Sequence, residues 1–200
     1  MDADKIESAK IDTDSFFEIP RRAFLDTNVV NITLDHSDQI HDHQPLPECL
    51  SANRRSDVEA LCGIFDTGQR AGWEFVVSPL TYQEVSSTAN PIRRDNLESW
   101  FAELWYCWSE SVSRNNQMPS ILEIEQSRLE IMQSGVLRAL PDSEDRLLIA
   151  DAIAYRCDCF CTCDYRTVIN HRDELAELPI QILTPTEWWR IILPWAPTWL

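Results

Sequence analysis

The 200-residue sequence has few basic residues, few glycines and no long apolar run. Seventeen Lys and Arg residues face 33 Asp and Glu residues, which gives a formal net charge of −16. Proteins that coat nucleic acid gain affinity by neutralising phosphates with basic side chains, so this balance excludes strong non-specific binding. No window reaches the roughly 18 apolar residues of a membrane span, and we expect no membrane partner. The chain starts with acidic rather than apolar residues, which favours a cytoplasmic location over secretion.

Several motifs of common enzyme classes are also missing. With only four glycines, the chain has no phosphate-binding glycine-rich loop, and neither a Ser-His-Asp order nor a CxxC pair is present. Four of the seven cysteines alternate along 157–163, which predicts one strand face lined with thiols. Four ligands along one strand cannot surround a zinc ion, so we expect small buried side chains and reduced thiols. The histidines of 36–43 are interpreted as part of a solvated loop.

The order of apolar segments predicts one α/β domain. Short apolar runs at 23–25, 73–77, 157–163 and 180–183 indicate strands. Helical spacing appears at 56–72, from Thr81, at 147–154 and at 186–193, whereas 35–55 is expected to be a loop. Strands that alternate with helices are typical of a parallel sheet covered on both faces.

The segment 88–140 is expected to add two amphipathic helices to this domain. The first is predicted to begin at Asp95, with Glu98 closing a capping box. It carries an aromatic stripe that we interpret as core packing, with base stacking as the remote alternative. The second covers 121–137. Residues 1–20 form an acidic lead-in, 21–193 the main domain, and 194–200 a tail rich in Trp and Pro.

Four acidic residues are predicted to meet at one edge of the sheet. In parallel sheets, sites form beyond the carboxyl ends of the strands. Asp26 follows the first strand, Glu84 lies in the helix after the second, Asp145 opens the helix before the third, and Asp164 follows the third. Carboxylates brought together repel one another unless a cation neutralises them. Oxygen ligands of this kind suit Mg²⁺ or Mn²⁺, which can activate water against a phosphodiester.

Each carboxylate also has a purely structural explanation. Glu84 follows Thr81 by three residues and could complete a capping box. Asp145 lies at a helix start, where acidic side chains favour the helix dipole. Asp26 and Asp164 could each cap the segment that follows them. Taken singly these explanations are at least as good as a metal site, but the set of four favours the site.

Five segments carry further patterns in a fixed order. Residues 24–30 are an apolar strand followed by Asp-Thr-Asn, and 76–85 are a strand, a Ser and a helical Glu. Residues 145–152 are an Asp leading into an apolar helix, 158–164 a strand ending in Thr-x-Asp, and 182–188 a strand followed by Pro-x-Glu. Together these segments resemble the motifs of the PIN-domain nucleases, toxin-type ribonucleases among them.

The resemblance implies a three-layer α/β/α sandwich with a central parallel sheet and a metal-dependent endoribonuclease acting on single-stranded or structured RNA. It implies that the acidic metal-site residues are Asp26, Glu84, Asp145 and Asp164. It also implies that Asn28, Ser78 and Thr162 orient those ligands or contact substrate. Asp151 lies six residues after Asp145, about 240° around a helix, and is interpreted as a packing or outer residue.

The sequence departs from the family pattern in three places. The segment 88–140 is longer than compact members need, and Arg156 stands where a Gly often precedes the third strand. The acidic surface is unusual for a protein that meets RNA. A toxin role would add an antitoxin protein as partner. The alternatives are a non-catalytic PIN scaffold binding RNA or protein, and an Asp-dependent phosphatase, which Asn28 disfavours because a second Asp is needed there.

The C-terminal segment holds four tryptophans, at positions 188, 189, 195 and 199. If the last of them lie on the surface, they form an apolar patch suited to a homodimer. If they fold back, they cap the sheet. The sequence leaves both alternatives open.

Overall fold

The fold is α/β with an all-parallel sheet, as the alternation of strands and helices predicts. The computed structural model describes residues 16–114, 119–175 and 178–199. Its four strands are β1 (Arg22–Leu25), β2 (Glu74–Val76), β3 (Cys159–Cys161) and β4 (Gln181–Leu183), in the order β2-β1-β3-β4. Phe24 of β1 lies opposite Val76 of β2 and Phe160 of β3. The two central strands, β1 and β3, therefore end side by side.

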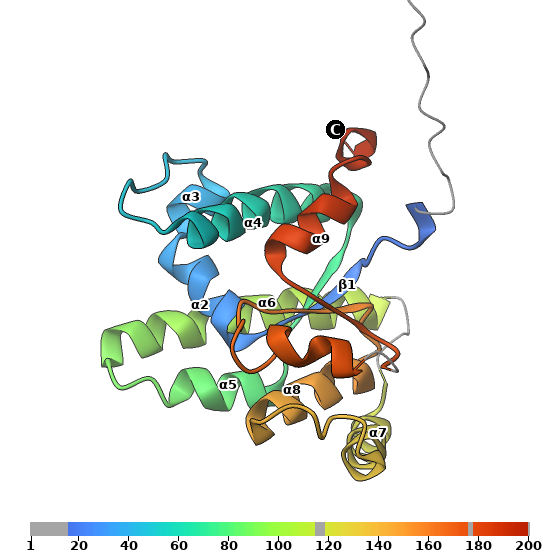
Figure 1. The fold of residues 1–200 in the computed structure, drawn as a ribbon. Coiled ribbons are helices and arrows are strands. Elements are labelled where there is room, and N and C mark those ends of the chain that lie inside the picture. The colour runs from blue at the N-terminus through green and yellow to red at the C-terminus, as the bar shows by residue number, and fades with distance from the viewer. Residues whose placement is uncertain (1–15, 115–118, 176–177, 200) are drawn as a thin grey trace, which may run out of the picture.

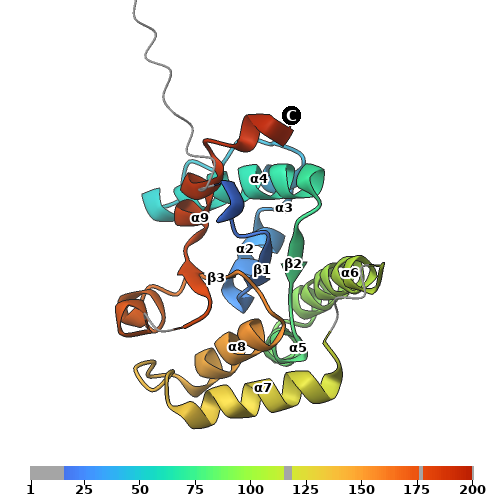
Figure 2. The same ribbon diagram turned by 90° about the vertical axis from the view of Figure 1, so that its right-hand side faces the viewer.

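Alternate residues of the strands face two separate cores. Ala23, Leu25, Cys159 and Cys161 belong to one core, while Phe24, Val76, Phe160 and Ile182 belong to the other. The first core is covered by α2 (Thr27–Asp35), α4 (Ala52–Ala71) and α9 (Pro185–Ile192), and the second by α7 (Ile121–Ser134) and α8 (Ser143–Ala154). Figures 1 and 2 show these two groups of helices on opposite sides of the strands, an arrangement consistent with three layers.

Polar residues define where the helices begin and end. Ser51 caps α4 by accepting a hydrogen bond from the backbone N of Arg54, and Gly72 ends the helix in the left-handed conformation. Reciprocal capping boxes open α7 at Ser120 and α9 at Thr184. These caps satisfy backbone donors that have no partner within the helix. The two helices predicted near 121–137 and 186–193 are thus confirmed, with boundaries shifted by one to three residues.

Two predicted helix boundaries are wrong. The segment 35–55 is not a continuous loop, because it contains the short helix α3 (Ser37–His41) and the first residues of α4. The helix α6 (Pro91–Arg114) begins four residues before Asp95. Asn90 accepts a hydrogen bond from the backbone N of Arg93 through Oδ1 (3.1 Å), and Pro91 occupies the first helical position. Asn followed by Pro is a stronger start signal than the box expected at Asp95.

The segment 88–140 forms two helices, as predicted, and the first wraps around the β2 edge. On α6 the buried side chains include Leu97, Phe101, Leu104 and Trp108. The first three join the α4-side core, whereas Trp108 joins the α8-side core. The aromatic stripe is therefore packing between layers. The helix α5 (Pro79–Ser86) connects β2 to α6.

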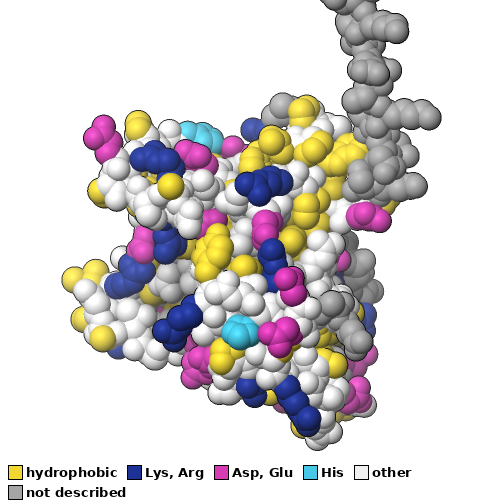
Figure 3. All heavy atoms as spheres, in the orientation of Figure 1, with side chains coloured by type: hydrophobic (Ala, Val, Ile, Leu, Met, Phe, Trp, Pro, Cys, Tyr) yellow, Lys and Arg dark blue, Asp and Glu magenta, His cyan; other side chains and the backbone are white. Residues whose placement is uncertain are grey.

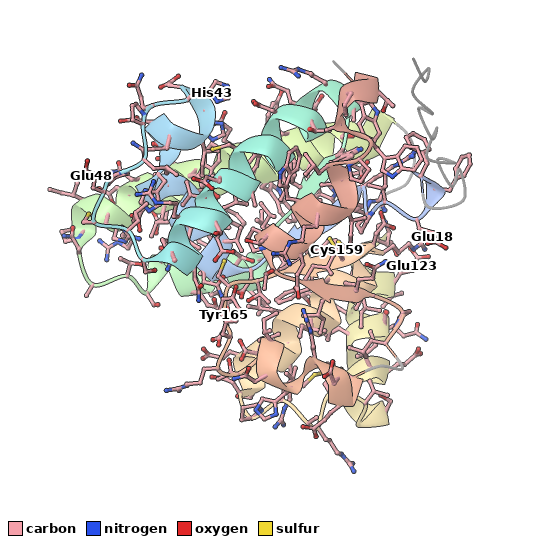
Figure 4. All side chains as sticks on the ribbon, turned by 45° about the horizontal axis from the view of Figure 1, so that its top comes forward. Glu18, His43, Glu48, Glu123, Cys159 and Tyr165 are labelled. Atoms are coloured by element: carbon pink, nitrogen blue, oxygen red, sulfur yellow. The ribbon has the colours of Figure 1, made fainter. Side chains whose placement is uncertain are left out.

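The alternating cysteines divide between the two cores. Cys159, Cys161 and Cys163 contribute to the α4-side core, but Cys157 precedes the strand and lies in the other core. The prediction of four thiols on one strand face is therefore wrong at its first member, since β3 spans three residues only. The seven cysteines are free thiols. Figure 4 shows Cys159 in the middle of the molecule, between helices.

The C-terminal tail folds back instead of projecting. After α9, the turn η2 (Ala196–Trp199) places the Trp195 and Trp199 rings 5.2 and 5.5 Å from the ring of Phe16. Trp199 also meets Trp73, at 5.4 Å. Of the two alternatives for this segment, folding back is confirmed, but onto the lead-in and the start of β2. Figure 3 shows hydrophobic side chains gathered at this end.

Residues 1–15 of the acidic lead-in and Leu200 of the tail lie outside the described residues. In the described part of the chain, no helix combines the length and the apolar character required to cross a membrane.

Candidate metal-dependent site at the carboxyl ends of the strands

Asp26 lies at the centre of the sheet edge, directly after β1. Its backbone N donates to the carbonyl of Cys161 (3.0 Å), which continues the pairing of β1 with β3 by one residue. The residue is 3% exposed. It occupies the N-cap position of α2, but its side chain makes no capping hydrogen bond. The helix-capping role considered for Asp26 is therefore wrong, and its carboxylate is available for other contacts.

A hydrogen-bonded network fixes the Asp26 side chain against the end of β3. The Thr162 hydroxyl donates to Asp26 Oδ2 (2.5 Å), and Asn28 Nδ2 donates to the same oxygen. The backbone N of Cys163 donates to Asn28 Oδ1 (2.8 Å), and that of Asp164 donates to Thr162 Oγ1 (2.9 Å). Asn28 and Thr162 thus orient a carboxylate, the role that the resemblance implies for them.

The environment of Asp26 favours its neutral form. Burial raises the pKa of Asp26 from 3.8 to about 7, against the hydrogen bond from Thr162, which lowers it. The value of about 7 also includes the negative charges of Asp145 and Glu84, which contribute to the rise after burial. Residues from β1, α5 and α8 are therefore close enough to interact electrostatically around one buried carboxyl group.

Glu84 and Asp145 are half-buried carboxylates whose pKa values are both raised, and the charge of Asp145 contributes to the rise at Glu84. For both, burial is the largest cause, and the charges of Asp142 and Glu144 add to it. Nearby threonine hydroxyls lower both values in part, those of Thr27 and Thr167 respectively. Three like charges near one another are costly unless a cation lies among them.

Three buried oxygens of this region have no hydrogen-bond partner in the described part of the chain. They are Asp145 Oδ2, Thr27 Oγ1 and Thr167 Oγ1. The two hydroxyls lie near the carboxylates without reaching good hydrogen-bond geometry. Buried polar atoms are nearly always satisfied in folded proteins, so each such atom calls for a partner such as water or an ion. The Thr27 and Thr167 hydroxyls lie beside the carboxylates of Glu84 and Asp145 respectively.

Asp164 differs from the other three carboxylates. Its Oδ1 accepts hydrogen bonds from the backbone N atoms of Arg166 and Thr167, both at 2.8 Å. Burial raises the pKa of Asp164, but these hydrogen bonds and the Arg166 charge outweigh it, so the pKa is lowered. The capping role considered for Asp164 is present, and its charge also acts on Asp145.

Ser78 and Thr81 cap the helix α5, so Glu84 has no capping role there. Ser78 is fully buried at the N-cap of α5, where its Oγ accepts from the backbone N of Leu80 (3.2 Å). The capping box pairs Ser78 with Thr81, so the box expected between Thr81 and Glu84 is wrong. Ser78 stabilises the start of the helix that carries Glu84. Asp142 likewise caps α8, in whose first turn Asp145 lies.

Two more buried carboxylates surround the site without belonging to it. Asp151 of α8 is 1% exposed and pairs with Arg128 of α7 (3.1 Å), which agrees with its interpretation as a packing residue. Asp57 of α4 is 3% exposed and accepts a hydrogen bond from the hydroxyl of Thr186 (3.0 Å) and a weak one from Cys163 Sγ (3.6 Å). Sequence reasoning missed Asp57, although an acidic residue four positions before Leu61 lies on the apolar stripe of that helix.

A hollow of about 260 Å³ opens beside Glu84, between α5 and α8. Apolar side chains of Leu80 and Leu147 line it together with Gln83 and Glu144. Figure 4 shows Tyr165 in the loop after β3, below the first half of α4. Of the four candidate ligands, Glu84 lines this hollow, whereas Asp26 is buried.

The donor chemistry of the site suits a hard divalent cation, since every candidate ligand is an oxygen. Within the described ranges, no three His, Cys, Asp or Glu side chains converge closely enough to hold one ion as they stand. The charges of Glu84 and Asp145 act on Asp26, but the side chains do not form a complete set of metal ligands.

No family model, curated protein or solved structure matches this chain.

Proposed function

We propose that this chain is a Mg²⁺- or Mn²⁺-dependent endoribonuclease of the PIN type, which hydrolyses phosphodiester bonds of single-stranded or structured RNA. The observation that carries the proposal is the charge coupling of Asp26, Glu84 and Asp145 at the carboxyl edge of the sheet. Asp145 and Glu84 raise the pKa of Asp26, and Asp145 Oδ2 is buried without a hydrogen-bond partner; both observations support a place for a cation among these carboxylates.

Each residue has a part in this proposal. Asp26, Glu84, Asp145 and Asp164 would hold the metal. When bound, the ion would lower the pKa of a water molecule and neutralise charge on the phosphate. Asn28 and Thr162 hold the Asp26 carboxylate in one orientation. Metal binding would therefore lose less side-chain entropy at this residue. The turn at 164–167 fixes Asp164 in the charged form.

The acidic surface is compatible with an enzyme that would contact the RNA phosphate through a bound metal ion. With a net charge of −16, the chain gains little from non-specific phosphate contacts. A divalent ion bound among the carboxylates would reverse the local charge where the phosphate arrives. A toxin role, with an antitoxin protein covering this acidic edge, is one cellular setting for such an activity. A cytoplasmic location fits both.

The second candidate is a non-catalytic PIN scaffold that binds RNA or protein. One observation favours it: the described carboxylates do not converge on a single point. A scaffold would keep the sheet edge and the Asp26 network but would bind no ion. Metal affinity therefore separates the two candidates before any activity is measured.

The decisive experiment is cleavage of a mixed-sequence single-stranded RNA with Mg²⁺ or Mn²⁺, using wild type and Asp26→Asn. The matched control is Asp158→Asn, an exposed aspartate at the opposite ends of the strands, where it accepts hydrogen bonds from the backbone of Arg21 and Arg22. We expect wild type and Asp158→Asn to cleave equally. Asp26→Asn should lose at least about 100-fold, as expected for removing a central metal ligand.

Other outcomes point elsewhere. Equal residual cleavage by Asp26→Asn would indicate a contaminating nuclease. Absence of cleavage together with absence of Mn²⁺ binding by calorimetry would reject the metal-dependent nuclease in favour of the scaffold. Circular dichroism of each variant confirms that the fold is kept.

A further inference from the structure

A pocket of about 590 Å³ lies between α4 and α6, away from the carboxylates of the candidate site. Its aromatic lining comes from Phe65 of α4, Trp73 and Phe75 at β2, and Trp100 of α6. We call it the α4–α6 pocket. Figure 2 looks onto the β2 side of the molecule, with α4 above and α6 below and to the right. None of the four carboxylates of the candidate site lines this pocket.

The aromatic rings of the pocket are already arranged around one another. The rings of Phe65 and Phe75 lie 4.7 Å apart. His41 at the end of α3 places its ring edge-on to both Phe65 (5.6 Å) and Trp100 (5.5 Å). A flat nitrogen-containing ring thus already packs against two aromatic rings here. Such faces attract cations through their quadrupoles, and planar guanidinium groups stack on them well.

The charged groups of the pocket are acidic. Asp66 of α4 and Glu103 of α6 line it. Asp66 lies 3.6 Å from the exposed imidazole of His43. Solvent-exposed ion pairs of this kind contribute little to stability. Glu103 has no ion-pair partner among the described residues. Acidic groups beside aromatic faces select a cation and repel phosphate, and the net charge of −16 acts in the same sense.

The indole of Trp100, which lines the pocket, also carries an unpaired donor. Trp100 Nε1 is buried, and no acceptor for it exists in the part of the chain that the structure describes. A buried indole N–H usually finds a partner, so the missing hydrogen bond is a cost to the fold.

We propose that the α4–α6 pocket binds a guanidinium group carried by an arginine-like ligand, stacked on the aromatic lining and paired with Glu103 and Asp66. The ligand is defined by this chemistry, which a free arginine derivative and an arginine side chain within a peptide share. Binding here is independent of the nuclease proposal, because no residue is common to the two sites.

Calorimetry with N-acetyl-arginine amide tests the pocket. The neutral isostere N-acetyl-citrulline amide has the same shape, so the loss of charge alone should weaken binding at least about tenfold. The Glu103→Gln variant should weaken binding of the arginine amide by about three- to fivefold, the range of a partly exposed ion pair. The matched control is Glu110→Gln, an exposed glutamate on the same helix outside the pocket, which should bind like wild type.

The ¹H–¹⁵N NMR spectrum locates the ligand. The arginine amide should shift the indole N–H signal of Trp100, identified by its absence in Trp100→Phe. A tripeptide with central arginine that binds tighter than the amide supports a peptide side chain as source, and equal affinity supports a free small molecule. Equal binding of the arginine and citrulline amides, tighter binding of uridine or adenosine monophosphate, or no binding by any probe would overturn the proposal.

Discussion

At the scale of single residues, Asp26 sets how the fold responds to pH. Its pKa rises from the ordinary value of 3.8 to about 7 in the fold, chiefly through burial, so folding favours the protonated form. Between these values the folded state binds more protons than the unfolded state, and stability falls as pH rises. Above pH 7 the full cost is present, about 4 kcal/mol by the conversion of pKa difference to free energy.

We therefore expect Asp26→Asn to be more stable than wild type at pH 8 and nearly equal to it at pH 4, when divalent ions are chelated. The amide has no charge to desolvate and still offers an oxygen to the Thr162 hydroxyl. Denaturant unfolding at several pH values measures the difference. If wild type and variant keep a constant difference across this range, Asp26 does not titrate as described.

Mg²⁺ should act on wild type alone. A cation bound to Asp26 favours its ionised form, so added Mg²⁺ should restore much of the stability lost above pH 7. Thermal unfolding of wild type at pH 8 should shift upward with Mg²⁺, by a few degrees. The same titration of Asp26→Asn should leave the midpoint unchanged, and an equal shift in both proteins would mean that the ion binds elsewhere.

The backbone conformation of Arg156 lowers the stability of the fold. The residue adopts a φ of 57°, and the backbone N atoms of Arg156 and Cys157 donate to the carbonyls of Ile153 and Ala152 (both 2.9 Å). This is the pattern of a helix end that normally uses Gly. The sequence departure noted at this position is thus a strained helix end, with a conformation that costs a non-Gly residue roughly 1 kcal/mol.

We expect Arg156→Gly to raise the free energy of unfolding by about 0.5–1 kcal/mol, because glycine adopts positive φ without strain. The guanidinium contributes little, since its contact with Glu123 is long (3.9 Å) and exposed. Urea unfolding measures the change. Arg156→Ala serves as control: it removes the same side chain but keeps the strained backbone, and it should not stabilise the protein.

At the scale of elements, α4 and α9 pack closely because Gly63 has no side chain. A Cβ at this position would lie 2.5 Å from Cη2 and Cζ2 of Trp189. We expect Gly63→Val to lower the free energy of unfolding by about 1–3 kcal/mol, as for other overpacked contacts. Adding Trp189→Leu should recover part of this loss. A Gly63→Val protein as stable as wild type would show that the indole moves aside without cost.

The elements also show what sequence could and could not predict. Hydrophobic runs indicated β1 and β3, and helix periodicity indicated α4, α7 and α9, because burial on one face leaves a repeating pattern. The start of α6 at Pro91 was missed because the capping box at Asp95 competes with Asn90 as a start signal. The short helix α3 was missed because five polar-rich residues carry almost no periodicity.

The candidate site was predictable in position but not in electrostatic detail. The ends of β1 and β3 place Asp26 and Thr162 side by side, which follows from strand order alone. Sequence could not distinguish Asp164, held charged by its own turn, from Asp26, held neutral by burial. The burial of Asp57 was also not predicted, because its partner Thr186 lies 129 positions away and only the fold brings the two together.

At the scale of the whole molecule, the net charge of −16 opposes both folding and contact with RNA. Raising the salt concentration screens repulsion between surface carboxylates and should therefore stabilise the protein. RNA is itself an anion, so in the absence of divalent ions the proposed enzyme should bind it weakly. A cation held by Glu84, Asp145 and their neighbours would supply the missing attraction.

We expect the affinity for a 2′-O-methyl RNA, which resists cleavage, to rise at least about tenfold when Mn²⁺ replaces EDTA, a gain of about 1.4 kcal/mol. Fluorescence anisotropy of the labelled RNA measures this directly. The Asp26→Asn variant should bind equally weakly with and without Mn²⁺, because its site no longer holds the ion. Tight binding in EDTA would instead mean that the arginines form a phosphate-binding surface of their own, and the metal would then serve chemistry alone.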